Sequence, residues 1–171
     1  KLKNKHMLDF KKIENIAAIV LLVAFFMPWL SVVGLGSMSG YDIPGVVKKG
    51  LQMIAGIEAA FSSFSLDGSA PAPAEPAAVD VPFQVYLVYL VPLAAIAVLV
   101  ADYLKLDEKV ARIISVVAGV IPVGGFVYGV IAIQDPEAKL AQASLEIGVY
   151  LMLLAGIAML LATFKIIKMP K

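Results

Sequence analysis

The sequence predicts an all-α fold: an integral membrane four-helix bundle with an amphipathic helix in its first outer loop. The chain has 171 residues and is 61% hydrophobic, whereas soluble domains are about 45–50% apolar. It contains four apolar segments, each near the ~20 residues that a helix needs to cross a bilayer. The length favours a single membrane domain, residues 1–171. The four predicted spans are about 13–33, 81–101, 113–133 and 145–164.

The first apolar segment, 13–33, follows the basic stretch 1–12. Its apolar core is on the long side for a cleaved signal peptide, so we expect an uncleaved first span. Trp29 stands near the far end of this segment. An indole has an apolar body and a polar N–H, so Trp29 is expected at the boundary between lipid and water.

The loop 34–80 is polar and begins with GLGSMSG, which we expect to be flexible. Asp42 is a plausible N-cap for the helix that follows it. Apolar residues recur at helical spacing over 46–64, which predicts an amphipathic helix lying on the membrane or capping the bundle. A Pro/Ala linker, 68–78, leads to the second span. Pro92 is expected to kink that span.

The third span, 113–133, is the predicted packing centre of the bundle. It carries no charge, and its small residues fall on one side of a helix, which lets another helix approach closely. In the fourth span, small residues recur every seven positions, a spacing that suits left-handed packing. The predicted helix-packing residues are Ser115, Gly119, Gly125, Gly129, Gly148, Ala155 and Ala162.

The distribution of cations predicts the orientation of the chain. Eleven of the 14 Lys and Arg residues lie in the two terminal stretches and in the turn 102–112. With four spans these three regions share one side of the membrane. Because cytoplasmic loops carry an excess of Lys and Arg, we expect both termini in the cytoplasm and the chain in the cell (inner) membrane.

The search for chemistry yields no predicted catalytic, cofactor-binding or metal-ligating residue, and no cofactor. The chain has no cysteine, and His6 is its only histidine. Ionisable groups at mid-membrane depth are costly and usually functional, but none lies near the middle of a span. We interpret Glu14, Asp102 and Glu146 as interfacial charges that reach water. The formal net charge of +1 gives no reason to expect a nucleic-acid partner.

Two short motifs, FMPWLS at 26–31 and SGYDI at 39–43, resemble a pattern in small bacterial four-span membrane proteins. In that family a first span ends in Pro-Trp-x-Ser and a Ser-Gly-(Tyr/Trp)-Asp turn follows. The resemblance covers about a tenth of the chain and implies no catalytic residue. The plan of four spans with a large first loop is also similar in shape to claudin-like tetraspans, although the paired loop cysteines of that family are absent.

The leading functional hypothesis is a non-catalytic structural or accessory subunit, in contact with membrane lipids and with a larger membrane complex or further copies of itself. Trp29, Tyr41 and Asp42 are the candidate outer docking residues. One alternative is a module that binds or transports a lipid or apolar ligand in a cleft that Pro92 and Pro122 open between the second and third spans. A second alternative is an enzyme subunit whose site is completed by a partner chain.

Overall fold

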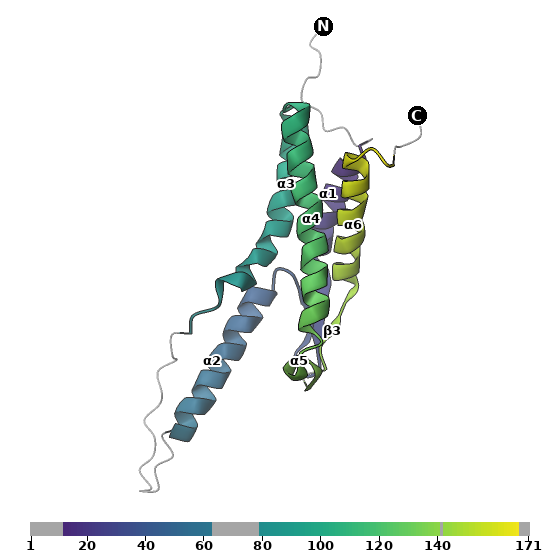
Figure 1. The fold of residues 1–171 in the computed structure, drawn as a ribbon. Coiled ribbons are helices and arrows are strands. Elements are labelled where there is room, and N and C mark those ends of the chain that lie inside the picture. The colour runs from purple at the N-terminus through teal and green to yellow at the C-terminus, as the bar shows by residue number, and fades with distance from the viewer. Residues whose placement is uncertain (1–11, 63–78, 141, 168–171) are drawn as a thin grey trace, which may run out of the picture. The chain divides into compact units, whose positions relative to one another are not determined.

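The computed structural model describes residues 12–62, 79–140 and 142–167, which are mostly helical (Figure 1). The chain divides into two compact units, residues 1–41 with 88–171, and residues 42–87. The elements in chain order are α1 (Ile13–Phe26), β1 (Pro28–Val32), β2 (Gly36–Ser39), α2 (Ile43–Ser62), the 3-10 helix η1 (Phe83–Tyr89), α3 (Leu90–Tyr103), α4 (Glu108–Ala132), α5 (Pro136–Leu140), β3 (Ser144–Leu145) and α6 (Ile147–Thr163).

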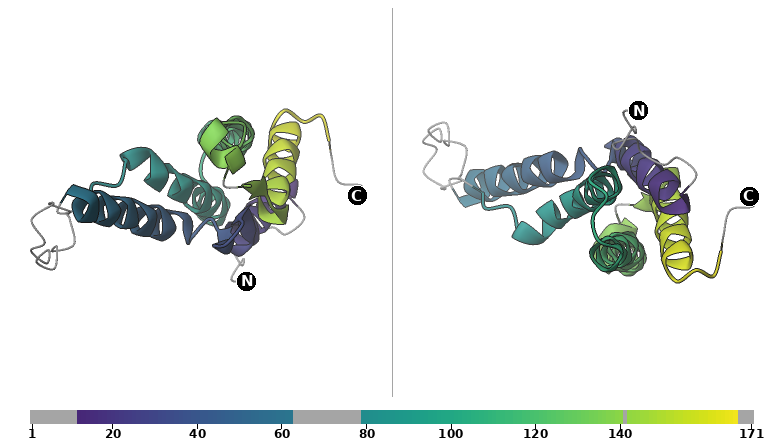
Figure 2. Two further views of the ribbon diagram at one scale, coloured as in Figure 1. Left: turned by 90° about the horizontal axis from the view of Figure 1, so that it is seen from below. Right: turned by 90° about the horizontal axis from the view of Figure 1, so that it is seen from above.

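The first unit is built on α1, α3, α4 and α6, which Figure 2 shows from both ends. Helix α1 packs against α3 and α6, and α4 packs against the same two helices. Small side chains fill much of this interior, so the helices can approach closely. Its buried apolar residues include Ala17, Ala18, Leu21, Ala24, Ala95, Ala101, Ala118, Met152, Ala155 and Met159.

The contact between α4 and α6 is tightest at Gly119, Pro122 and Gly156. A Cβ atom on Gly156 would lie 2.7 Å from Cγ of Pro122 and 2.9 Å from the carbonyl oxygen of Gly119. Pro122 is fully buried. Its ring therefore fills the contact between α4 and α6.

Substituting Gly156 should separate α4 from α6, whereas substituting Gly124 should not. We expect Gly156→Ala to lower the free energy of unfolding by about 1–3 kcal/mol, because the added methyl group meets backbone and a proline ring. Gly124 lies within α4 and has nothing within 4 Å of an added Cβ. Gly124→Ala should raise stability by up to about 1 kcal/mol through its helix propensity. Denaturant unfolding of the two purified variants checks this, and equal effects would contradict the packing described.

The first apolar segment is not one continuous helix over 13–33, because α1 ends at Phe26. Met27 precedes Pro28 and has extended backbone angles, as expected for a residue before proline. Residues 28–32 then form β1, which pairs antiparallel with β2 and with β3 in the order β2-β1-β3. The all-α prediction therefore missed a small sheet.

The sheet also orders the glycine-rich stretch that the sequence predicted to be flexible. Gly34 and Gly36 have φ angles of 88° and 81°, which reverse the chain between β1 and β2. Strand β3 pairs with the middle of β1, and the N–H of Glu146 donates to the carbonyl of Trp29 at 2.9 Å. The sheet thus ties the end of α1 to the beginning of α6.

The other apolar segments are helical with shifted bounds. The second begins as η1 and continues as α3, with Pro92 in the first turn, where proline needs no N–H partner. Helix α4 begins at Glu108, so residues 108–112 are not a turn, and the side chain of Asp107 caps this helix. Residues 83–103 and α4 are long and apolar enough to cross a membrane, whereas α1 and α6 are shorter apolar helices.

The second unit contains α2, which corresponds to the amphipathic helix predicted over 46–64. The carbonyl of Asp42 accepts a hydrogen bond from the N–H of Val46, so Asp42 directly precedes the first helical turn. Met53, Ile54 and Ile57 are exposed on this helix. The predicted Pro/Ala linker, 68–78, lies outside the described residues.

Candidate functional site

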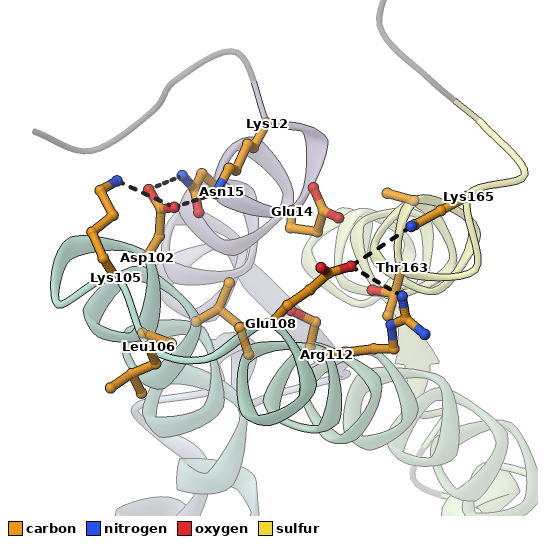
Figure 3. A pocket seen from close by; sticks show the side chains of 15 residues that line it. Lys12, Glu14, Asn15, Asp102, Lys105, Leu106, Glu108, Arg112, Thr163 and Lys165 are labelled. Carbon is orange, nitrogen blue, oxygen red and sulfur yellow. Dashed lines mark hydrogen bonds and ion pairs between the residues drawn. The ribbon is translucent and has the colours of Figure 1, made fainter.

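A polar pocket of about 400 Å³ lies at the end of the first unit where α1 and α4 begin and α3 and α6 end (Figure 3). Its lining holds four cationic and three carboxylate side chains together with apolar ones. The charged residues are Lys12, Glu14, Asp102, Lys105, Glu108, Arg112 and Lys165, and the apolar lining includes Val98, Ala101, Ala111 and Ala162.

One side of the polar pocket is a buried cluster around Asp102, whose side chain is 6% exposed. Lys12 Nζ donates to Oδ1 of Asp102 at 2.5 Å, and Lys105 Nζ lies 3.6 Å from the same oxygen. The amide of Asn15, a residue only 1% exposed, donates to Oδ2 at 2.8 Å. A carboxylate removed from water needs such partners, so this cluster fixes the start of α1 against the end of α3.

This burial corrects the interpretation of Asp102 as a charge that reaches water. The sequence reasoning missed Asn15 entirely. One signal was available: Asn15 stands near the start of the first predicted span, and Asp102 directly follows the second, so both lie at the ends of apolar segments. Polar groups at that depth tend to pair with one another.

The other side of the polar pocket is an exposed cluster around Glu108, whose side chain is 77% exposed. Oε1 of Glu108 lies 3.3 Å from Nη2 of Arg112 and 3.6 Å from Nζ of Lys165. Exposed ion pairs of this kind contribute about 0–1 kcal/mol each. The exposed cluster is therefore held loosely, in contrast to the cluster around Asp102.

Glu14 stands between the two clusters (Figure 3). It comes from the first turn of α1 and is half-buried. Within residues 12–62, 79–140 and 142–167, its carboxylate takes part in no hydrogen bond and no ion pair. The polar pocket thus offers one carboxylate that is not already committed to a cation of the described chain.

Two of the pocket lysines occupy left-handed backbone positions. Lys105 directly follows the C-cap of α3 and Lys165 that of α6, with φ angles of 54° and 60°. In both places the N–H of the next residue donates to a carbonyl five positions earlier, at 3.1 and 2.9 Å, which is the Schellman ending of a helix. Glycine is usual there, and a residue with a Cβ costs about 1–2 kcal/mol.

Of the candidate docking residues, Trp29 is part of the interior. It is 7% exposed, its indole N–H donates to the carbonyl of Ala24 at 2.6 Å, and its ring packs edge-on against Phe25. A Cβ atom on Gly40 or Gly148 would lie within 3.0 or 2.6 Å of the indole. The Pro-Trp and Ser-Gly parts of the two motifs therefore have a packing role.

The other two candidate docking residues are exposed. Tyr41 is 60% exposed, and its ring centroid lies 6.4 Å from that of Phe26. The hydroxyl of Tyr89 donates to the carbonyl oxygen of Tyr41 at 3.4 Å. Asp42 is exposed at the start of the second unit.

The predicted helix-packing residues divide into two groups. Five are buried: Ser115, Gly119, Gly148, Ala155 and Ala162. Gly125 is exposed and Gly129 half-buried, and a Cβ on either would make only ordinary contacts, at 3.7 and 3.6 Å. Ser115 and Ala162 also line the polar pocket.

In the part of the chain that the structure describes, no three His, Asp or Glu side chains are grouped so as to hold a metal ion. His6 lies outside those residues. No family model, curated protein or solved structure matches the chain. The polar pocket and the apolar helix surfaces are the features of the described chain that bear on its function.

Proposed function

We propose that the chain is a multi-pass membrane protein that acts as a non-catalytic structural or accessory subunit. The observation that supports it is the separation of apolar and charged surface along α3 and α4. From 113 to 132 no residue of α4 is charged, and large apolar side chains are exposed along both helices. Water would not favour such a surface, whereas lipid does. These side chains include Leu93, Ile96, Val100, Ile113, Val117, Val120, Val127 and Ile131.

In this proposal α1 and α6 also cross the bilayer, although they have only 14 and 17 residues. At ~1.5 Å per residue they span about 21 and 26 Å. The strand β1 adds up to ~17 Å beyond α1. Because β1 pairs with β2 and β3, much of its backbone is hydrogen-bonded, as the edge of a membrane requires. The chain thus forms a four-span bundle whose sheet end lies in the outer headgroup region.

The polar pocket lies at the cytoplasmic face in this proposal. Lys12 and Lys165 belong to the terminal stretches, Lys105 to the α3–α4 connection and Arg112 to the beginning of α4, at the membrane side where the positive-inside rule expects cations. Both termini are then cytoplasmic. The outer side carries α2, whose exposed apolar residues would cover a partner subunit or the headgroup surface.

Cysteine accessibility tests the topology, since the chain has no native cysteine. Leu35→Cys and Leu140→Cys change exposed residues at the sheet end, and Asp107→Cys changes one at the opposite end. We expect an impermeant maleimide to label the first two in intact cells, and the third only after permeabilisation. Labelling of all three from the same side would overturn the four-span arrangement.

Cross-linking in native membranes followed by purification tests the accessory role. We expect a stoichiometric partner, either another membrane protein or a second copy, and contacts through α2 or Tyr41. A homogeneous monomer with no cross-linked partner would overturn the subunit assignment while leaving the topology intact.

A lipid-binding role is a second candidate, and the polar pocket favours it. The polar pocket is open, and its lining carries both cationic and carboxylate side chains. Its volume and charges fit a headgroup rather than an acyl chain.

A further inference from the structure

We propose that the polar pocket binds a phospholipid headgroup made of a phosphodiester and a primary ammonium, as in phosphatidylethanolamine. The inference rests on the proposed membrane orientation, which puts the pocket at headgroup level on the inner leaflet. Basic pockets between membrane helices on this side are suited to lipid headgroups. The charges of the pocket lining identify the kind of headgroup.

The phosphodiester would be bound by Arg112 and Lys165. Both side chains are at least half exposed and are joined to Glu108 by exposed ion pairs that exchange readily. Arg112 has five N–H donors, of which the described contact to Glu108 uses one nitrogen. A planar guanidinium can bind two phosphate oxygens at once, so Glu108 would turn to water as the phosphate enters.

The ammonium would be bound by Glu14. This carboxylate lies beside the exposed cluster around Glu108, which contains Arg112 and Lys165 (Figure 3). It has no partner within the described residues. A primary ammonium has three N–H donors for a carboxylate, whereas a quaternary choline has none. A glycerol headgroup offers no positive charge to Glu14. Free inorganic phosphate has no ammonium group, so Glu14 would stay without a partner. The negative charge of the phosphate would also lie beside the negative charge of this carboxylate.

The surroundings of the pocket favour a lipid over a soluble phosphate compound. Leu106 belongs to the lining and is exposed, and Ile113 in α4 and Phe164 after α6 are exposed apolar residues at the same end of the first unit. Val98 and Ala101 add buried apolar side chains to the lining. Acyl chains leaving the headgroup would therefore continue along apolar helix surface.

Lys165→Gly is a decisive variant, because it removes a pocket cation and relieves its left-handed backbone. Its unfolding temperature should rise, so lost binding cannot be ascribed to misfolding. Arg112→Gln removes the second phosphate ligand and Glu14→Gln the ammonium ligand. Lys139→Gln, an exposed lysine at the sheet end, is the matched control.

The experiment is native mass spectrometry of the full-length protein released from detergent micelles that contain equimolar phosphatidylethanolamine, phosphatidylcholine and phosphatidylglycerol. We expect the first lipid to be retained roughly tenfold better than the others, a preference that Lys165→Gly and Arg112→Gln abolish. Glu14→Gln should reduce its retention to the level of phosphatidylcholine, and Lys139→Gln should change nothing.

Equal retention of the three lipids would overturn the headgroup assignment. Retention that is unchanged by Glu14→Gln and Arg112→Gln would overturn it as well. Displacement of bound lipid by millimolar inorganic phosphate would also overturn it, since the site would then recognise phosphate alone. These outcomes are distinct from failure of the proposed topology, which the maleimide labelling reports independently of lipid.

Discussion

Asp102→Ala is expected to lower the free energy of unfolding by about 3 kcal/mol. The substitution removes a buried carboxylate that accepts from Asn15 and Lys12, and the Asn15 amide loses this acceptor inside the protein. Glu108→Ala is the matched control, since Glu108 also pairs with two cations but is exposed. It should cost no more than about 1 kcal/mol.

Unfolding of the detergent-solubilised variants by a denaturing detergent measures both costs. Equal losses for Asp102→Ala and Glu108→Ala would mean that burial does not distinguish the two clusters. Asp102→Asn should fall between wild type and Asp102→Ala, because its amide oxygen still accepts from Asn15 while the ion pairs are lost.

Trp29→Ala should be among the most destabilising single changes, with a loss of about 3–5 kcal/mol. The indole fills the space between Phe25, Gly40 and Gly148, and its N–H is hydrogen-bonded to backbone. Trp29→Phe should recover part of this loss, since it keeps a ring in the cavity. Tyr41→Ala should stay within about 0.5 kcal/mol, as is usual for exposed positions.

Thermal unfolding of the three variants checks this order. A small effect of Trp29→Ala would contradict its place in the interior and would revive the docking interpretation. If the expected order is found, Tyr41 is the better position at which to disrupt contact with the proposed partner subunit, because removal of its side chain leaves the fold intact.

Helix positions could be predicted from the sequence because long apolar runs and helical spacing are local properties. The helices α4 and α6 lie within a few residues of the predicted spans, and α2 begins three residues before its predicted start. The end of α1 could not be placed in the same way. Residues 28–32 continue the apolar segment with Trp29, Leu30 and Val32, and a short apolar run does not distinguish helix from strand.

The polar pocket as a whole could not be predicted, because it depends on contacts between distant residues. Asn15 and Asp102 are 87 positions apart, and neither residue alone indicates a partner. Lys105 and Lys165 stand where glycine normally marks a left-handed helix end, so the usual signal was missing. The pattern of small residues on the third predicted span identified Ser115 and Gly119 as buried, but Gly125 and Gly129 make no close contact.

The three-stranded sheet has a consequence for how the protein is made. Strand β1 is synthesised early, but its partner β3 comes from residues 144–145, after the third long apolar segment. Until the ribosome has released that region, one edge of β1 has no strand to pair with. An unpaired strand edge can form hydrogen bonds with another chain and so lead to aggregation. A nascent chain that stops before residue 144 should therefore be a substrate for proteolytic quality control, whereas the completed chain should survive.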